Sequence, residues 1–389
     1  MSAPLKKAEP VRVLIIRNPQ PYDFGGGERM PVHLAVELSQ YNFEPLLVSR
    51  SPAVLEYAAS KGVQTVRGWW WSRQNWSGRN NLLLPAYFVW QLILTCWYLQ
   101  LIARTRASII HPQGRDDFIA ATIAGKILSK RVIWSDHADL KYIYENYSAP
   151  YKNPIGKLVY RLSKLTSAIT MTSNSDAAAI KQALKVPQLP PQYTVVYNGV
   201  SDDPVKPTKR AEADKSAYIY CATSRLVTAK GISELIDAFN KLHEKHANTR
   251  LWLIGDGPDA ERFKAQAKKN PAITFFGYTK APLALVAASD VFVHPSYLEG
   301  FSVSLIEAAM LAKPTIACNV GGNPEIITHD KTGLLIKDRD TSALYDAMNA
   351  LYADRKLAQR LGTDARKNFE QNFQFETIVR ERFLPLYGN

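Results

Sequence analysis

The sequence predicts an α/β protein built from two doubly wound domains in tandem, and three observations support this prediction. The chain has 389 residues, which is too long for one ordinary hydrophobic core and suits two domains. Short apolar, β-branched runs alternate with helical stretches, an order that is typical of parallel sheets. The alternation stops at one charged, proline-containing segment and then begins again.

Each half supplies its own series of strands. In the first half the predicted strands are 11–17, 44–49, 62–66, 107–111, 131–135, 168–173 and 193–197. In the second half they are 217–223, 250–255, 272–277, 290–294, 314–318 and 333–337. Helical stretches separate most of them, among them 116–129, 154–165, 175–185, 231–245 and 303–312, and the helices 341–352 and 355–371 follow the last strand.

Residues 202–217 combine charges with two prolines and little apolar content, which predicts a linker. The N-terminal domain is then 1–201 and the C-terminal domain 218–372. Ligands of doubly wound sheets bind beyond the carboxyl ends of the strands, and two such sheets facing each other leave a cleft. We therefore expect the functional residues in loops that follow strands.

Composition excludes several classes of protein. Apolar residues make up 46%, charged residues 21% and aromatic residues 11%, which is ordinary for a globular chain and excludes a disordered or collagenous one. Cys96, Cys221 and Cys318 lie far apart without a CxxC motif, which argues against a disulfide framework and a thiolate zinc site. The apolar run after the first lysines, VLII, is too short for a signal peptide, so we expect a cytoplasmic protein.

The positive charge is concentrated in the first half of the chain. Residues 1–200 have 23 Lys and Arg against 12 Asp and Glu, whereas the second half has 25 against 23. Residues 57–115 contain no acidic residue and six of the eight tryptophans. A basic, aromatic region predicts a polyanionic partner, either a membrane or a nucleic acid. A nucleic acid is the weaker alternative because no known binding module is recognisable.

Three loops are candidates for the chemistry. The first, YDFGGGERM (22–30), follows the first strand but lacks the GxGxxG spacing of a dinucleotide site. It is either a tight turn or a loop whose N–H groups face an anion or a sugar. In the second, Arg225 and Lys230 lie between a strand and the helix near Gly231, which suits a diphosphate as well as a solvated loop.

The third loop, HPSYLEGFSVSLIEAAM (294–310), is the most informative. Glu299 and Gly300 lie in the loop, a helix begins near Ser302, and Glu307 lies about one and a half turns into it. Free N–H groups at such a helix start can hold an anion, with carboxylates on either side for sugar hydroxyls. The DxD sequence at 338–340 opens another helix, where Asp340 is predicted to be an N-cap and not a metal ligand.

With these motifs in order, the sequence resembles the retaining glycosyltransferases of family four, which have the GT-B architecture of two Rossmann-like domains facing across a cleft. The resemblance covers nearly the whole chain and is densest in residues 217–352. The family's paired glutamates match Glu299 and Glu307, and its Arg–Lys loop matches Arg225 and Lys230. Further matches are LIGDGP (253–258), FFGYT (275–279), GGNPEI (321–326), TGLLIK (332–337) and, more loosely, WSDHAD (134–139) and VVYNGV (195–200).

The resemblance implies a role for each matching residue. Glu307 would hold the ribose, Glu299 the sugar hydroxyls, and Arg225 with Lys230 the diphosphate. The other implied positions are Gly300, Phe301 and Ser302 as N–H donors, Gly277 and Tyr278 beside the base, His137 beside the transferred sugar, and Gly26 and Gly27 near acceptor and phosphate. The third glycine, Gly27, departs from many relatives, which leaves the acceptor role of this loop open. In relatives, a final helix returns to the N-terminal domain. Here the corresponding segment is 373–389, with an apolar stripe at Phe375, Ile378, Phe383 and Leu386. A helix packed on the C-terminal domain is the alternative.

The implied reaction is sugar transfer from a nucleotide-diphosphate sugar with retention at the anomeric carbon, without a metal or other cofactor. A nucleotide-sugar epimerase of the same architecture and a glycosyltransferase with a soluble acceptor remain alternatives. Neither the sugar nor the base follows from the sequence.

Residues 82–102 form an uncharged run of 21 residues, about 31 Å as a helix, which is long enough to span a bilayer. The strands before and after this run belong to one sheet, and a single membrane crossing would put them on opposite sides of the bilayer, which argues against spanning. A buried crossover helix is another alternative. We expect residues 67–106 to dock on an anionic membrane surface near a lipid-linked acceptor, because interfacial side chains precede the run. These are Trp69, Trp70, Trp71, Trp76, Arg67, Arg73 and Arg79.

Overall fold

The computed structural model describes residues 9–19, 25–69, 84–137, 140–145, 154–211, 214–268 and 270–388. The chain divides into two compact units, which we treat separately. The N-terminal unit comprises the chain up to Tyr197 together with Val379–Asn389, and the C-terminal unit is Asn198–Ile378.

In the N-terminal unit the described strands form a seven-stranded parallel sheet in the order β3-β2-β1-β4-β5-β6-β7. The strands are β1 (Val11–Ile16), β2 (Phe43–Ser49), β3 (Gln64–Arg67), β4 (Ile109–Pro112), β5 (Arg131–Asp136), β6 (Ala168–Met171) and β7 (Tyr193–Val195). The helices are α1 (Gly26–Leu38), α2 (Pro52–Ser60), α3 (Leu84–Thr105), α4 (Arg115–Ile127), α5 (Leu140–Ile143), α6 (Pro154–Ser163), α7 (Asn174–Leu184), the π-helix η4 (Val379–Phe383) and α16 (Leu384–Tyr387).

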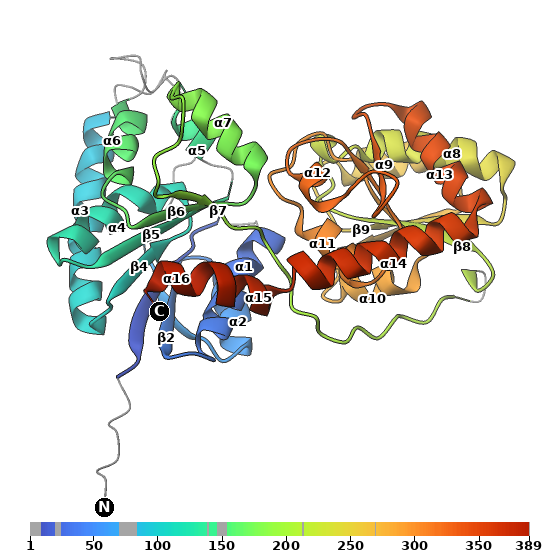
Figure 1. The fold of residues 1–389 in the computed structure, drawn as a ribbon. Coiled ribbons are helices and arrows are strands. Elements are labelled where there is room, and N and C mark those ends of the chain that lie inside the picture. The colour runs from blue at the N-terminus through green and yellow to red at the C-terminus, as the bar shows by residue number, and fades with distance from the viewer. Residues whose placement is uncertain are drawn as a thin grey trace, which may run out of the picture. The chain divides into compact units, whose positions relative to one another are not determined.

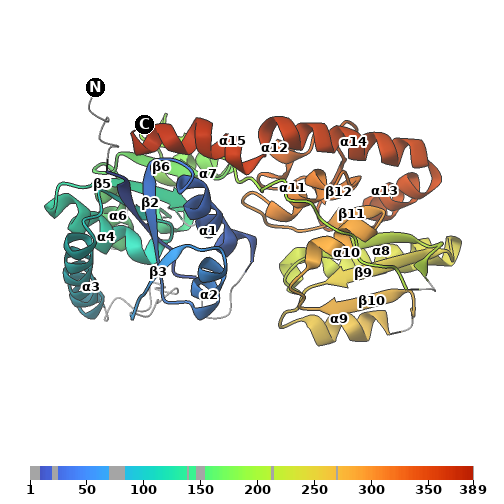
Figure 2. The ribbon, with the colours of Figure 1, turned by 90° about the horizontal axis from the view of Figure 1, so that it is seen from below.

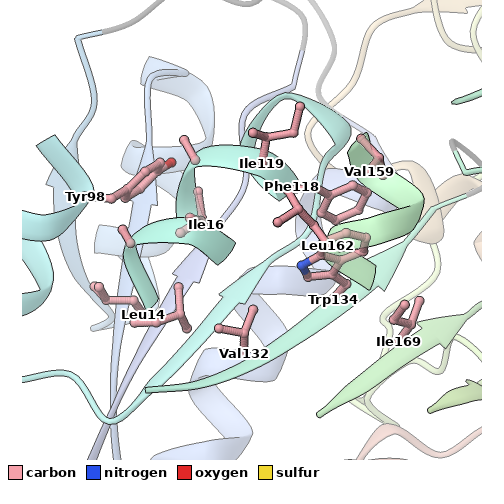
Figure 3. Close-up of a cluster of buried hydrophobic side chains, with 14 of the residues drawn as sticks. Leu14, Ile16, Tyr98, Phe118, Ile119, Val132, Trp134, Val159, Leu162 and Ile169 are labelled. Atoms are coloured by element: carbon pink, nitrogen blue, oxygen red, sulfur yellow. The ribbon is translucent and has the colours of Figure 1, made fainter. Parts of the chain in front are cut away.

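Helices cover both faces of this sheet. Helices α1 and α2 lie on one face with the C-terminal segment, and α3, α4 and α6 lie on the other (Figure 1). The strand order reverses between β1 and β4, which is the switch point where ligands of doubly wound sheets bind. Figure 3 shows the core under α4, where Trp134 stacks on Phe118 with ring centroids 4.4 Å apart. Strand residues such as Ile16 and Val132 complete this apolar layer, which fixes the positions of the strand ends.

One polar cluster is buried beside this core. The fully buried Asp117 at the start of α4 accepts hydrogen bonds from the Tyr98 hydroxyl (2.7 Å) and from Nδ2 of Asn18 (2.9 Å). The Oδ1 of Asn18 in turn accepts from the backbone N–H of Arg50 (2.9 Å). Burial, partly offset by these bonds, raises the pKa of Asp117 to about 7. The cluster joins α3, α4 and the loops that follow β1 and β2.

In the C-terminal unit the described strands form a six-stranded parallel sheet in the order β10-β9-β8-β11-β12-β13. The strands are β8 (Tyr218–Thr223), β9 (Thr249–Ile254), β10 (Ile273–Gly277), β11 (Val291–His294), β12 (Thr315–Cys318) and β13 (Leu334–Ile336). The helices are η3 (Thr228–Lys230), α8 (Ile232–Lys245), α9 (Ala260–Ala267), α10 (Pro282–Ala288), α11 (Val303–Met310), α12 (Asn323–Ile326), α13 (Thr341–Ala353), α14 (Arg355–Asn372) and α15 (Phe375–Ile378). Helices α8, α9 and α13 cover one face, and α10, α11 and α14 the other (Figures 1 and 2).

The predicted fold class, two doubly wound α/β domains, is confirmed. Two segments differ in detail from the expected ones. The segment 202–217 belongs to the C-terminal unit, because Arg210 binds Asp290 (3.0 Å) and the carbonyl of Ala288 (2.8 Å). The final segment is not one regular helix, since the wider turn of η4 separates α15 from α16.

The π-helix changes which residues of the final segment are buried. Phe375, Ile378 and Phe383 are buried as expected, but Leu386 is only half-buried and Tyr387 takes the inner position. The Tyr387 hydroxyl hydrogen-bonds Nδ1 of His111 on β4 at 2.5 Å, within the N-terminal unit. A regular helical period cannot predict this shift, because a π-turn adds one residue to the turn.

Candidate functional site

The loops that follow β8, β9, β11 and β12 meet at the carboxyl edge of the C-terminal sheet. The backbone N–H of Tyr297 donates to the carbonyl of Ala229 (2.9 Å), and that of Leu226 donates to Asp256 (2.9 Å). Because these strands are parallel and adjacent, residues far apart in sequence converge at this edge. We call this place the carboxyl-edge site.

Two glycines allow the loops to approach this closely. A Cβ at Gly231 would lie 2.0 Å from the Pro295 carbonyl oxygen, and one at Gly321 would lie 1.9 Å from that of Glu299. Both also have positive φ angles, +67° and +52°, which favour glycine. A larger residue at either position would separate the loop that contains Glu299 from its neighbours.

Glu299 is the centre of the carboxyl-edge site. Its Oε1 accepts hydrogen bonds from Nζ of Lys230 (2.5 Å) and from Nε2 of His294 (2.8 Å). Its side chain is only 11% exposed. Both contacts are to Oε1, so among the described residues Oε2 has no hydrogen-bond partner and remains an acceptor for a substrate hydroxyl.

The environment keeps Glu299 ionised. Its burial alone would raise the pKa, but the charges and hydrogen bonds of His294 and Lys230 outweigh burial and hold the pKa well below its usual range. A carboxylate that stays ionised accepts hydrogen bonds and does not donate a proton, so Glu299 is suited to orienting hydroxyl groups.

The start of α11 lies next to this carboxylate. Ser302 is the N-cap residue, yet its side chain caps no N–H of the helix, and its Oγ lies 3.2 Å from Nε2 of His294 instead. The first-turn N–H groups of α11 are therefore left without the usual side-chain acceptor, and they can serve an anion. The buried Phe301 and Ser302 hold this turn in place, and Gly300 accepts from the N–H of Gly322 (2.9 Å).

The other residues predicted in this unit occupy the same edge. Arg225 is exposed in the loop after β8, and Glu307 is half-buried in the second turn of α11. Gly277 ends β10 with a φ of +66°, its carbonyl accepts from the N–H of Gly255 (2.9 Å), and the adjacent Tyr278 is exposed. All the residues predicted in the C-terminal unit thus follow or flank the carboxyl ends of its strands.

A second polar group lies at the switch point of the N-terminal sheet. Arg17, directly after β1, donates to Oε1 of Glu28 (2.9 Å) and to the carbonyl of Gln113 (2.5 Å). The other carboxylate oxygen of Glu28 accepts from the N–H of Gly25 (2.9 Å). This pair fixes the start of α1, which contains the predicted Gly26 and Gly27.

His137 follows β5 at the same edge. Its Nε2 lies 3.3 Å from Oε1 of Gln113, and because an amide oxygen only accepts, Nε2 carries the proton. Burial, aided by the charge of Arg17, lowers the pKa of His137 well below its usual value. The ring is therefore neutral at pH 7, and Nδ1 is an acceptor.

Sequence reasoning missed several members of both groups. It gave no functional role to His294, His111, Arg17, Glu28 or Gln113. His294 in fact contacts Glu299, and the available signal was its position as the last residue of a strand that leads into the candidate loop. His111 is buried in the N-terminal unit, where burial lowers its pKa to about 3.

Two further predictions concern metals and the membrane region. Asp340 is the N-cap of α13, since Oδ1 accepts from the N–H of Ala343 (2.9 Å), which confirms its predicted role. Within the part of the chain that the structure describes, no group of three His, Cys, Asp or Glu side chains could hold a metal ion. Of the predicted membrane residues, Arg67 and Trp69 are exposed, whereas Trp70, Trp71, Arg73, Trp76 and Arg79 lie outside the described residues.

Comparisons with known protein families match both halves of the chain. Residues 24–204 match the model of glycosyltransferase family 4, and residues 206–368 match that of glycosyl transferases group 1. Similar proteins include a capsular polysaccharide biosynthesis glycosyltransferase of Staphylococcus aureus, 30% identical over 42% of this chain and 44% of that protein. Another is a GDP-mannose-dependent α-(1-6)-phosphatidylinositol monomannoside mannosyltransferase of Mycobacterium tuberculosis, 28% identical over 58% of this chain and 63% of that protein. The chain spans about half the length of the first curated relatives it matches.

Solved structures show the same fold. A glycosyltransferase from Rickettsia africae covers 98% of this chain and all of its own, with a TM-score of 0.76 and 18% identity. The Anabaena protein HepE in complex with UDP-glucose covers 97% of this chain and all of its own, also with a TM-score of 0.76 and 18% identity. The fold is therefore GT-B, with two Rossmann-like domains.

Proposed function

Because the chain belongs to the family 4 glycosyltransferases, we propose that it transfers a sugar from a nucleotide-diphosphate sugar to an acceptor hydroxyl with retention at the anomeric carbon. The observation that supports this most is the carboxyl-edge site, where an ionised Glu299 lies between Lys230, His294 and the start of α11. Such a site combines cation, carboxylate and free N–H groups, which are the partners that a sugar diphosphate needs.

The donor would bind through the residues around Glu299. Lys230, Arg225 and the first-turn N–H groups of α11 hold the diphosphate, and Oε2 of Glu299 accepts hydroxyl hydrogen bonds from the sugar. Glu307 holds the ribose, and Gly277 and Tyr278 flank the base. In the N-terminal unit, Gly26, Gly27 and His137 serve the acceptor and the transferred sugar, with Nδ1 of the neutral His137 as the acceptor atom.

The reaction we propose is a front-face displacement. The bond between the anomeric carbon and the diphosphate oxygen breaks, and the acceptor oxygen bonds to the same face of the carbon. The acceptor proton passes to the leaving phosphate oxygen. Lys230 and Arg225 stabilise the charge that develops on the diphosphate, a type of contact typically worth about 2–4 kcal/mol, so that no metal ion is required.

We further propose a lipid-linked saccharide or glycolipid as the acceptor, at the cytoplasmic face of an anionic membrane. The names of two relatives support a lipid acceptor: one is the phosphatidylinositol monomannoside mannosyltransferase, and the other is a lipopolysaccharide core biosynthesis glycosyltransferase of Rhizobium meliloti. The basic, tryptophan-rich composition of residues 57–115 supports the proposal that this membrane is anionic. A soluble acceptor is the second candidate, since a similar Bacillus anthracis protein is an N-acetyl-α-D-glucosaminyl L-malate synthase.

A donor screen tests this proposal. We expect at least one of a panel of UDP- and GDP-sugars to raise the melting temperature of the full chain, and the corresponding free sugars to leave it unchanged. Each binding donor is then incubated without an acceptor and the products are analysed by mass spectrometry. Conversion to an isomeric nucleotide sugar would favour the epimerase alternative, and a panel in which no nucleotide sugar binds would contradict the proposal.

A further inference from the structure

Helix α3 has two apolar faces, and only one of them is part of the core. On the buried face Leu94, Tyr98 and Ile102 pack into the core of the N-terminal unit beside α4. On the opposite face the exposed fractions are 38% for Phe88, 58% for Val89, 64% for Leu92 and 46% for Ile93. We call these four residues the α3 stripe.

The α3 stripe is one continuous surface. Residues 88, 89, 92 and 93 repeat at the spacing of successive helical turns, so their side chains lie next to one another. No Lys, Arg, Asp or Glu occurs between residues 84 and 103. Figures 1 and 2 show α3 at the outer side of the helical layer that it forms with α4. A patch of this kind on a soluble domain marks an interaction surface.

The basic residues in this part of the sequence indicate the partner of the α3 stripe. Residues 57–115 contain seven Lys and Arg and no acidic residue, and among the described ones Arg104, in the last turn of α3, and Arg106, directly after it, are exposed. At the end of β3, Arg67 and Trp69 are also exposed, and the Trp69 ring packs edge-on against Trp90 of α3 (5.6 Å). Exposed apolar side chains with tryptophan and arginine beside them suit the headgroup region of an anionic lipid surface.

The buried face of α3 opposes a membrane-spanning role. Within the described residues, α3 is the one helix long and apolar enough to cross a membrane by length and composition, with 33% of its most apolar window buried. Its buried face is tied to the unit by the Tyr98–Asp117 hydrogen bond and by packing against α4. If α3 spanned a membrane, Asp117 would lose its hydrogen bond from Tyr98, and the core that α3 covers would lose this helix. The geometry suits a helix that lies in the plane of the interface.

We propose that the α3 stripe inserts into the headgroup region of an anionic membrane, with α3 parallel to the membrane plane. This contact would bring the protein to a membrane-bound acceptor, and in that respect the inference rests on the proposed function. Binding to lipid is measured without any sugar transfer, so the two can fail separately.

The test is co-sedimentation of the full chain with phosphatidylcholine vesicles that contain or lack phosphatidylglycerol. The variant is Val89→Glu/Leu92→Glu, and the matched control is Leu165→Glu, an exposed leucine (49%) in the loop between α6 and β6. We expect the parent and the control to bind phosphatidylglycerol vesicles at low salt. The affinity of the variant for these vesicles should be lower by at least about tenfold. Melting temperature and the donor-induced thermal shift should be unchanged in all three proteins, which shows that they are folded.

Three outcomes would overturn the proposal. The first is equal vesicle binding by the variant and the parent, and the second is a parent that ignores anionic vesicles at low salt. The third is a parent that forms dimers in analytical ultracentrifugation which the variant abolishes, since the stripe would then be covered by a second copy. A donor-induced shift with no vesicle binding leaves the proposed sugar transfer standing and refutes only the membrane contact.

Discussion

At the scale of single residues, Lys230 and Glu299 form one ion pair, with Nζ of Lys230 2.5 Å from Oε1 of Glu299. Lys230→Ala removes the cation that we place beside the diphosphate. We expect turnover to fall by about a hundredfold and the apparent KM for the donor to rise by a smaller factor, because negative charge grows on the leaving group in the transition state. Steady-state kinetics measures both quantities. The matched control is Lys264→Ala on α9, where the lysine is exposed and pairs with the neighbouring Glu261. A pure change in donor affinity would contradict the role in the transition state.

Glu307 is predicted to act on binding. Glu307→Ala should weaken donor affinity by about tenfold to a hundredfold, because a charge-assisted hydrogen bond to the ribose is worth about 1.5–3 kcal/mol. Isothermal titration with the donor found by the thermal screen measures the change. Glu370→Ala on the exposed side of α14 is the control for the loss of a carboxylate. Equal affinities in the folded variant and the parent would refute the assignment.

Asp117 gives a pH dependence of stability. Its pKa is about 7 in the folded chain against an ordinary value of 3.8, so the folded state holds a proton that the unfolded state has lost in this range. The contribution is fully present below pH 3.8 and is lost as the pH rises to about 7, at about 1.4 kcal/mol per pH unit. Asp117→Asn should remove this slope from the free energy of unfolding measured in urea. The same slope in the variant and the parent would show that another group is responsible.

The sequence could predict candidate site residues that belong to a local motif, and it missed buried polar clusters that only distant contacts define. Arg225, Lys230, Glu299 and Glu307 each lie in a loop or helix start that can be recognised from a short stretch. Asp117 and its partners Asn18 and Tyr98 meet only through the fold, since nearly a hundred positions separate the first two. No local pattern distinguishes such a buried carboxyl from an ordinary first-turn aspartate.

At the scale of elements, a buried polar contact helps to hold the C-terminal segment on the N-terminal sheet. The Tyr387 hydroxyl bonds Nδ1 of His111, whose Nε2 bonds Oγ of Ser135 (2.7 Å). Tyr387→Phe should lower the free energy of unfolding by about 1–3 kcal/mol, because a buried imidazole nitrogen loses its partner. Tyr142→Phe, at an exposed position, is the control.

Deleting the residues after Gln374 should destabilise the N-terminal unit more than Tyr387→Phe does. Unchanged melting of that unit would contradict a stabilising role of the C-terminal segment.

The regular elements could be predicted because their patterns are local. Every strand expected in both halves is present, with shifts of one or two residues at the ends for most of them. The final segment was predicted as one helix and contains a π-helix, which no apolar spacing reveals. For α3, periodicity could not separate the core face from the exposed face, because both faces are apolar.

At the scale of the whole molecule, the two units differ in charge and in the type of site they contain. The excess of basic residues belongs to the first half of the chain, and the carboxyl-edge site belongs to the C-terminal unit. This division suits an enzyme whose acceptor is at an anionic surface and whose donor is a soluble nucleotide sugar. The fold alone does not assign the activity, since one architecture hosts many reactions.

We propose metal-independent, retaining transfer from a nucleotide-diphosphate sugar. The decisive measurement is the anomeric configuration of the product, determined by NMR. The full chain, its donor and a panel of lipid and alkyl-glycoside acceptors are incubated in excess EDTA. We expect an α-linked product from an α-linked donor, at a rate that EDTA does not change. A β-linked product, or activity that EDTA abolishes and Mg²⁺ or Mn²⁺ restores, would contradict it.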